Sequence, residues 1–142
     1  MYANSSERDG FEISSDPARL DLDAVERFLR ASYWAANRTR AVIEDSVRRS
    51  RCFGVYEESR GRQVGFARVV TDFATFAWLC DVVVDEAYRG QGLGKWLMDC
   101  VLSDPHLAGI PRWILATSSA HRLYERSGFR LLAHPERWME RT

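Results

Sequence analysis

The chain has 142 residues, of which 46% are hydrophobic and 28% charged, as is ordinary for a soluble globular protein. Its 20 Lys and Arg residues balance its 20 Asp and Glu residues, so no global field attracts it to nucleic acid or to an anionic membrane. No apolar run approaches the roughly 20 residues that a membrane span needs. These properties argue against nucleic-acid and membrane partners.

The first ten residues, MYANSSERDG, are polar and have neither the basic end nor the apolar stretch of a secretory signal. We expect residues 1–10 to form a loose tail before one domain at 11–142. Cys52, Cys80 and Cys100 are odd in number and far apart, which fits neither a disulfide framework nor a zinc site. A cytoplasmic protein with reduced core cysteines and no metal is expected.

The first half of the domain is predicted to hold a short strand and two helices. The strand is FEIS at 11–14. Asp23 and Glu26 form a capping-box pattern for a helix that continues to about Ser32. Thr39 is placed to cap the second helix.

Three strands are predicted next, at 51–57, 64–71 and 76–85. The third ends in a continuous valine run, as expected for a strand covered on both faces. A helix with one apolar side then leads to a strand at 112–117. This strand–helix–strand order predicts a right-handed crossover and a central parallel pair.

A short helix at about 119–127, ended by Gly128, and final strands at 129–132 and 137–140 complete the predicted elements. The predicted fold class is therefore α/β with a mixed central sheet, flanked by about four helices. Its early strands are antiparallel, and a parallel pair lies in the middle.

Residues 88–102, YRGQGLGKWLMDCVL, place three glycines at the start of a helix, although glycine is a poor helix former. A P-loop needs four residues between its first glycine and the Gly-Lys pair, but only three separate Gly90 from Gly94. A dinucleotide fingerprint would need its third glycine at Lys95. Both motifs are excluded.

The remaining pattern is Arg-x-x-Gly-x-Gly at a helix N-terminus, from Arg89 to Gly94. Unobstructed N–H groups at a positive helix end form an anion site, to which Arg89 and Lys95 add charge. The alternative is a turn that is glycine-rich without binding anything.

This stretch resembles the acetyl-CoA motif R/Q-x-x-G-x-G/A of the GCN5-related N-acetyltransferase (GNAT) superfamily. TSSAHRLYERSGF at 117–129 is similar to the family segment N-x-x-A-x-x-x-Y-x-x-x-G-F, with Thr117 where the family often has Asn. The resemblance extends from GFEIS through SGFRLL, which is nearly the whole chain.

The resemblance implies that the two central strands splay apart around the pantetheine arm of acetyl-CoA. Val82 and Val84 would then bind the arm through their main chain, and the segment 89–95 would hold the pyrophosphate. The implied cofactor-binding residues are Val82, Val83, Val84, Arg89, Gly90, Gln91, Gly92, Leu93, Gly94, Lys95 and Thr117.

The resemblance also implies that Tyr124 is the general acid for the CoA thiolate. A phenol with a reference pKa of about 10 stays protonated at neutral pH. The alternative is an ordinary tyrosine at the edge of the core. For His121, one turn earlier, a proton relay is one interpretation, and an exposed histidine at a helix start is the expected one.

Asp81 interrupts an apolar strand, where a carboxylate needs a partner. Its position is similar to that of acidic residues that contact the acceptor amine in some family members. It would bind the ammonium group or collect its proton through water. The alternatives are that it satisfies buried backbone donors or pairs with an arginine such as Arg68.

Tyr33 and Trp34 fall where the family builds its acceptor pocket, and two aromatics suit an aromatic, apolar or cationic acceptor. Core packing is the alternative. The predicted function is direct transfer of acetyl from acetyl-CoA to a primary amine of a small molecule or peptide, with a homodimer as a common arrangement among relatives.

Two other functions are considered. A non-catalytic acyl-CoA-binding sensor or interaction module would keep the glycine motif without needing Tyr124. A toxin-like transferase acting on aminoacyl-tRNA would need a basic groove, which the balanced charge disfavours.

Overall fold

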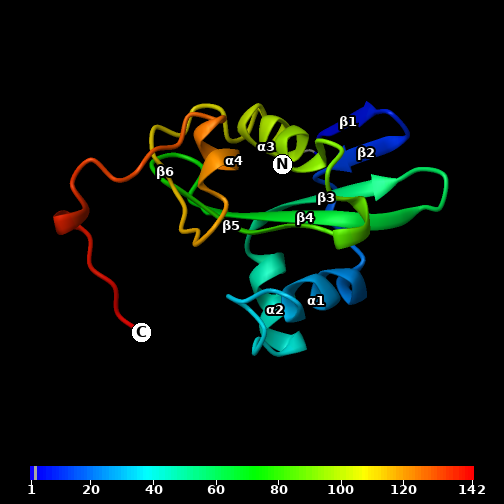
Figure 1. The fold of residues 1–142 in the computed structure, drawn as a ribbon, viewed down its shortest axis with the longest axis horizontal. Helices are drawn as coiled ribbons and strands as arrows, with labels where there is room; N and C mark the ends of the chain where they lie inside the picture. The colour runs from blue at the N-terminus through cyan, green and yellow to red at the C-terminus, as the bar shows by residue number, and fades with distance from the viewer. Residues whose placement is uncertain (2) are drawn as a thin grey trace.

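Six strands form one mixed sheet in the computed structural model, which describes residue 1 and residues 3–142 (Figure 1). Neighbouring strands pair in chain order, antiparallel from first to fifth and parallel between fifth and sixth. The strands are β1 (Ser5–Arg8), β2 (Phe11–Ser14), β3 (Arg51–Glu57), β4 (Arg62–Thr71), β5 (Ala77–Val84) and β6 (Trp113–Ile114). The predicted mixed α/β architecture is confirmed.

Helices cover both faces of the sheet (Figure 1). The pair α1 (Leu22–Arg30) and α2 (Arg40–Arg48) covers one face, and α3 (Leu93–Leu102) and α4 (His121–Glu125) lie on the other. Short 3-10 turns are η1 (Pro17–Arg19), η2 (Glu86–Tyr88) and η3 (Pro135–Arg137). Among the described residues, none of these helices is long and apolar enough to cross a bilayer.

Side chains that cap the first two helices explain where each begins. The Thr39 hydroxyl accepts from the Val42 N–H at 3.3 Å, which confirms the predicted cap of α2. The cap of α1 is Asp21, whose carboxylate accepts from the N–H groups of Asp23 and Ala24. The predicted capping box at Asp23 was wrong by two residues, because Asp23 already belongs to the first turn.

The N-terminal segment is a strand rather than the loose tail expected there. Residues 5–8 pair antiparallel with β2, from Ser5 opposite Ser14 to Arg8 opposite Phe11. Asp9 and Gly10 connect the two strands with positive φ angles of 52° and 84°. Asp-Gly is the preferred sequence of such two-residue hairpins, so a local signal for β1 was present in the polar segment.

A β-bulge divides β5 into two halves. Phe66 pairs with Val83 and Arg68 with Cys80, so Asp81 and Val82 together oppose Ala67. Asp81 adopts a φ of 53°, in the left-handed region. The extra residue reverses the alternation of side chains, and Asp81 thereby joins the face covered by α1 and α2.

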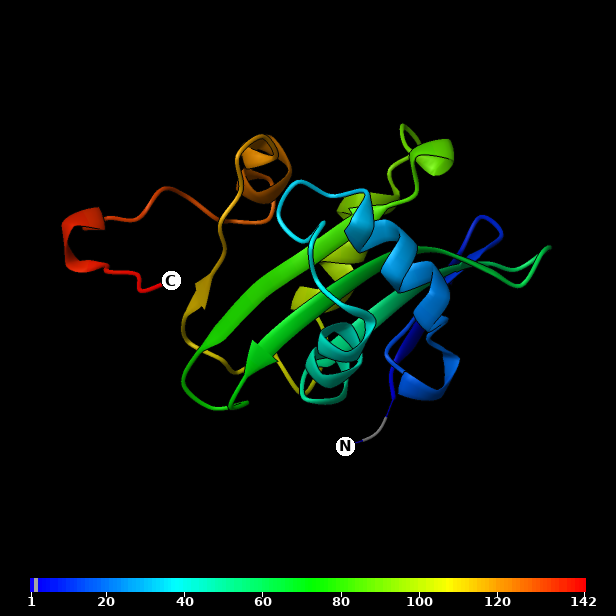
Figure 2. The same ribbon diagram turned by 90° about the horizontal axis from the view of Figure 1, so that it is seen from below.

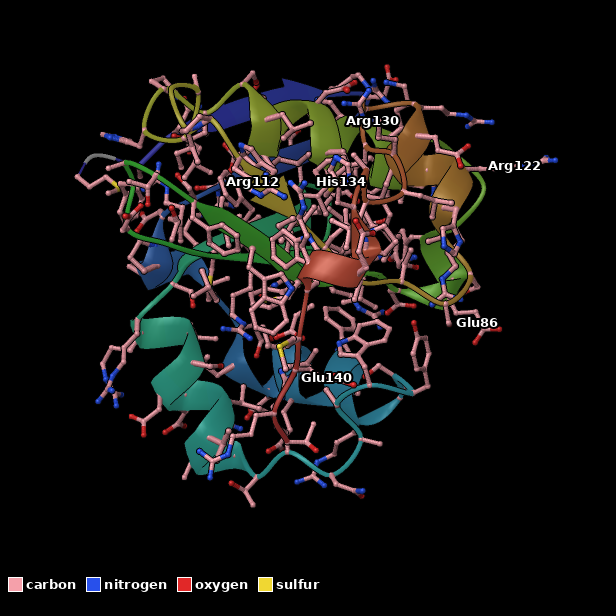
Figure 3. The ribbon with its side chains drawn as sticks, turned by 90° about the vertical axis from the view of Figure 1, so that its left-hand side faces the viewer. Glu86, Arg112, Arg122, Arg130, His134 and Glu140 are labelled. Atoms are coloured by element: carbon pink, nitrogen blue, oxygen red, sulfur yellow. The ribbon has the colours of Figure 1, made fainter. Side chains whose placement is uncertain are left out.

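The C-terminal segment after α4 forms no strand, so the strands predicted at 129–132 and 137–140 were wrong. Every residue from 130 to 142 is exposed, and the segment runs away from the sheet (Figure 2). In Figure 3, the labelled residues Arg130, His134 and Glu140 mark its course. Pro135 lacks an N–H donor and begins η3, which interrupts any ladder with β6.

Candidate functional site

The central strands β5 and β6 separate almost as soon as they pair. Their ladder contains only Ala77 with Trp113 and Trp78 with Ile114, so the rest of β5 has a free edge in the described structure. At its far end, the Asp85 N–H donates to the Val64 carbonyl of β4 at 2.7 Å. Because peptide groups alternate along a strand, those of Val84 and Val82 point to the free edge.

The valine run therefore has two different environments. Val82 and Val84 pack their side chains against the core beneath α3, while Val83 packs against the core beneath α1 and α2. Of the three, only Val82 and Val84 direct main-chain groups into the gap between β5 and β6.

Residues 89–95, called the glycine loop here, lead from the end of β5 into α3. Gly90 and Gly92 have φ angles of 83° and 84°, in the left-handed region that favours glycine. Gly92 is the N-cap of α3 and has no side chain to satisfy the first N–H groups of the helix. Donors of this kind at the positive end of a helix are suited to an anion.

The side chains of the glycine loop fix its shape and its charge. The Arg89 Nε donates to the Val84 carbonyl at 3.0 Å, and the Gln91 amide donates to the Tyr88 carbonyl at 3.0 Å. Lys95 forms an ion pair with Asp99 at 3.1 Å on the exposed side of α3. Arg89 therefore attaches the loop to the strand that borders the gap.

Arg8 of β1 is a cationic neighbour of the glycine loop that the sequence patterns did not reveal. A Cβ on Gly92 would stand 3.5 Å from an Arg8 terminal nitrogen, and the Arg8 guanidinium lies 4.9 Å from the centre of the Trp96 ring. The hairpin formed by Asp9 and Gly10 brings this arginine back onto the sheet. The Asp9-Gly10 pair was the sequence signal that could have predicted this hairpin and the position of Arg8.

The second part of the site is a cavity of about 540 Å³, called the acceptor cleft here. Six side chains on its wall matter below: Tyr33, Trp34, Arg38, Arg68, Asp81 and Tyr124. The loop between α1 and α2 forms one side, and the segment between β6 and α4 forms the other. The two sides meet where the Ser118 N–H donates to the Tyr33 hydroxyl at 3.0 Å.

Tyr33 and Trp34 lie in this cleft rather than in the core, so the core-packing alternative for them was wrong. Their rings meet edge to face at 5.0 Å, and both side chains are exposed. The Trp34 indole N–H donates to Asp81 at 2.9 Å. Hydrogen bonds from Ser118 lower the pKa of Tyr33 below its ordinary value.

Asp81 is buried and accepts hydrogen bonds on both carboxylate oxygens. Trp34 donates to Oδ1, while Arg38 and Arg68 donate to Oδ2 at 2.7 and 2.8 Å. Burial raises the pKa of Asp81, but the donors, Arg38 and Arg68 foremost, outweigh it and hold the pKa below its ordinary value. The structure thus shows the predicted alternative, an ion pair with Arg68, and the proton-collecting role is disfavoured because a stabilised carboxylate is a weak base.

Tyr124 lies on α4 with its ring buried and packed edge to face against Phe129 at 6.0 Å. Burial raises the pKa of Tyr124 to about 12, so the phenol is protonated at neutral pH. No described residue forms a hydrogen bond with its hydroxyl, and Tyr124 is one of the residues that line the acceptor cleft. The geometry leaves Tyr124 free to donate a proton there.

Thr117 and His121 mark the beginning of α4. The Thr117 hydroxyl accepts from the Ala120 N–H at 3.0 Å, so it caps the turn before the helix. His121 is exposed, as expected from its position. Among the predicted site residues, the fold thus gathers Tyr33, Trp34, Asp81, Thr117 and Tyr124 at the cleft, with the glycine loop beyond the other end of the valine run.

The ion pairs of Asp81 with Arg38 and Arg68 lead to a prediction about the stability of the fold. Asp81→Asn should lower the free energy of unfolding at pH 7 by about 3 kcal/mol, because two arginines lose their buried counter-charge. The pKa of Asp81 is lower in the folded state than its value of about 4 in the unfolded chain, so ionised Asp81 stabilises the fold above about pH 4. This stabilisation is lost as the pH falls through the pKa of the folded state. The difference between wild type and variant should therefore shrink below about pH 4.

Urea unfolding at a series of pH values measures that difference. Asp45→Asn is the control, because Asp45 is an exposed residue of α2 whose loss should change stability little at any pH. A difference for Asp81→Asn that stays constant down to pH 2 would contradict the assignment.

Comparisons with known proteins agree with this arrangement. A family model described as acetyltransferase (GNAT) domain matches residues 48–131. A crystal structure of a Xanthomonas campestris pv. campestris protein assigned to the GNAT family superposes with a TM-score of 0.90, at 42% identity over 96% of this chain and 95% of that one.

Two sequence relatives are named as acetyltransferases. An uncharacterized ycf52-like N-acetyltransferase of Prochlorococcus marinus is 30% identical over 84% of this chain and 68% of its own length. A candidate acetyltransferase of Gibberella zeae is 29% identical over 80% of this chain and 76% of its own length. With its splayed central strands, its glycine loop and these matches, the chain belongs to the GNAT family of acetyltransferases.

Proposed function

We propose that the protein transfers the acetyl group of acetyl-CoA directly to a primary amine of a small molecule or peptide. The observation that carries the proposal is the alignment of two features along one gap. The glycine loop offers free helix N–H groups at one end, and at the other lies Tyr124, whose phenol forms no hydrogen bond with the described residues. The main-chain edge of Val82 and Val84 that does not pair with β6 lies between them, and its Val84 carbonyl is bonded to Arg89.

The residues present fit a CoA pyrophosphate on the evidence of the glycine loop. Gly92 leaves open the space beside Arg8 that a Cβ would occupy, and its left-handed backbone exposes the first N–H groups of α3. Arg8 beside this opening and Arg89 of the glycine loop supply cationic side chains. Phosphate oxygens accept well from both kinds of donor.

At the other end of the gap, acetyl-CoA supplies an activated thioester carbonyl. A neutral amine in the acceptor cleft forms the new C–N bond, and the C–S bond breaks as electrons return to sulfur. Tyr124 gives its phenolic proton to that sulfur, which its protonated state at neutral pH permits. The proton lost by nitrogen passes to solvent at the open cleft, since Asp81 is committed to three donors.

The proposal is tested by measuring CoA binding and CoA release on the same preparation. Calorimetry should show stoichiometric CoA binding, and a thiol assay should show release that depends on an added amine. Binding without amine-dependent release across a broad panel would support a non-catalytic acyl-CoA-binding module instead. Absence of CoA binding would overturn both functions.

Arg8 gives a separate prediction for the cofactor side. Arg8→Ala should weaken CoA binding about tenfold, because a hydrogen bond to a charged group contributes about 1.5 kcal/mol. Calorimetry measures the change, and turnover at saturating acetyl-CoA should stay near that of wild type. Arg60→Ala, in the exposed β3–β4 hairpin, is the control and should bind CoA normally. Equal affinities in both variants would remove Arg8 from the site.

A further inference from the structure

The charges that line the acceptor cleft do not balance. Its charged side chains are Arg38, Arg68 and Asp81, which give two positive charges and one negative charge. The cleft therefore keeps one positive charge in its own wall. The Arg38 and Arg68 side chains are only 27% and 10% exposed, so solvent screens this charge poorly.

The carboxylate of Asp81 is buried, and two arginines already compensate its charge. One oxygen accepts from Trp34, and the other accepts from both arginines within 2.8 Å. A cationic group on the acceptor would find the charge of Asp81 already compensated by Arg38 and Arg68. The local field opposes a polyamine or another cation.

Arg38 retains donors that the described residues leave unused. Its Nη1 donates to Asp81, and no described residue accepts from its Nε or Nη2. Arg68 differs, because it donates to Asp81 through Nε and to Ser50 through Nη1. A partly exposed guanidinium with free N–H groups beside a cleft suits a two-oxygen anion.

We propose that the acceptor amine carries a carboxylate or phosphate group and that Arg38 binds this anion. This inference rests on the proposed function and narrows its substrate class to small anionic amines, such as an amino acid or an amino-alkyl phosphate. The anion neutralises the spare charge of the cleft and orients the amine. Tyr33 and Trp34 then contact the remaining apolar part of the acceptor.

Turnover of paired acceptors tests the proposal. Phenylalanine is compared with phenylalaninamide for the carboxylate, and phosphoethanolamine is compared with ethanolamine for the phosphate, with spermidine as the cationic acceptor. We expect at least a tenfold higher kcat/KM for the anionic member of one or both pairs. The pair that shows the preference distinguishes carboxylate from phosphate recognition.

Arg38→Gln should abolish that preference by raising KM for the anionic acceptor at least tenfold, while the CoA dissociation constant stays unchanged. Arg38→Lys, which keeps the charge but loses the planar fork, should recover part of it. Arg40→Gln is the matched control, because Arg40 pairs with Asp23 and Glu44 away from the cleft. Melting temperatures confirm that each variant is folded.

A binding experiment makes the outcome independent of turnover. Calorimetry compares N-acetylphenylalanine with N-acetylphenylalaninamide, and N-acetylphosphoethanolamine with N-acetylethanolamine, in wild type and in Arg38→Gln. Tighter binding of an anionic product, lost in the variant, supports the proposal. Equal binding within both pairs, or faster turnover of spermidine or of the neutral amines, overturns it, while amine-dependent release of CoA keeps the proposed function intact.

Discussion

Tyr124→Phe is expected to lower kcat by roughly 100-fold or more while leaving the CoA dissociation constant within about twofold. The substitution removes only the hydroxyl, and the buried ring keeps its packing against Phe129. Since no described residue bonds that hydroxyl, its removal leaves no partner unsatisfied. The loss should therefore appear in chemistry and not in stability or cofactor affinity.

Tyr56→Phe is a closely matched control for this experiment. Tyr56 is also buried, burial likewise raises its pKa to about 12, and its hydroxyl has no hydrogen-bond partner among the residues that the structure describes. It lies on β3 outside the acceptor cleft, so turnover should not change. Steady-state rates and calorimetric CoA affinities of both variants show whether the Tyr124 hydroxyl contributes to turnover. Full activity of Tyr124→Phe would exclude a proton-donating role.

Gly92→Val should weaken CoA binding by at least tenfold and lower the free energy of unfolding by about 1–2 kcal/mol. The stability loss follows from a branched residue at a φ of 84°. The affinity loss has a different cause, because the new side chain enters the space between the helix N-terminus and Arg8. Calorimetry and urea unfolding measure the two effects separately.

Gly61→Val separates backbone strain from obstruction. Gly61 also has a positive φ, of 59°, and a Cβ there meets nothing within 4 Å. It lies in the β3–β4 hairpin, away from the glycine loop. This variant should lose comparable stability and keep its CoA affinity. Normal affinity in Gly92→Val would instead show that the anion binds elsewhere.

Local chemistry made several elements predictable from the sequence. The Thr39 cap, the polar hairpin near Gly61 and the left-handed Gly128 each depend on one or two neighbouring residues. The helix after the glycine loop was predicted for the same reason, since an apolar stripe defines its buried side. These features need no knowledge of distant contacts.

Features that depend on distant segments were missed or misplaced. The bulge at Asp81 is invisible in an apolar run, because Val82, Val83 and Val84 look alike in sequence while their side chains face different cores. The final strands failed for a related reason. Apolar residues such as Leu131 predict a strand, but β6 gives them no long edge to pair with.

Some residues of the site could be predicted from the sequence, and others could not. Glycine positions and the tyrosine of α4 follow from motifs, whereas the partners of Asp81 required the fold. Arg38 lies 43 positions from Asp81 in the chain and Trp34 lies 47, and no spacing rule joins them. Arg8 was missed because the segment that holds it was taken for a tail.

The extra residue in β5 divides that strand into two halves, which present different groups to the site. Before Val82, the Asp81 side chain lines the acceptor cleft; from Val82 onward, the main-chain groups of Val82 and Val84 face the gap, and main-chain groups are the same whatever residue carries them. Under the proposed function, substitutions around the bulge would change the side chains of the acceptor cleft, with the loss of stability expected for Asp81→Asn, while the main-chain groups of Val82 and Val84 would stay the same.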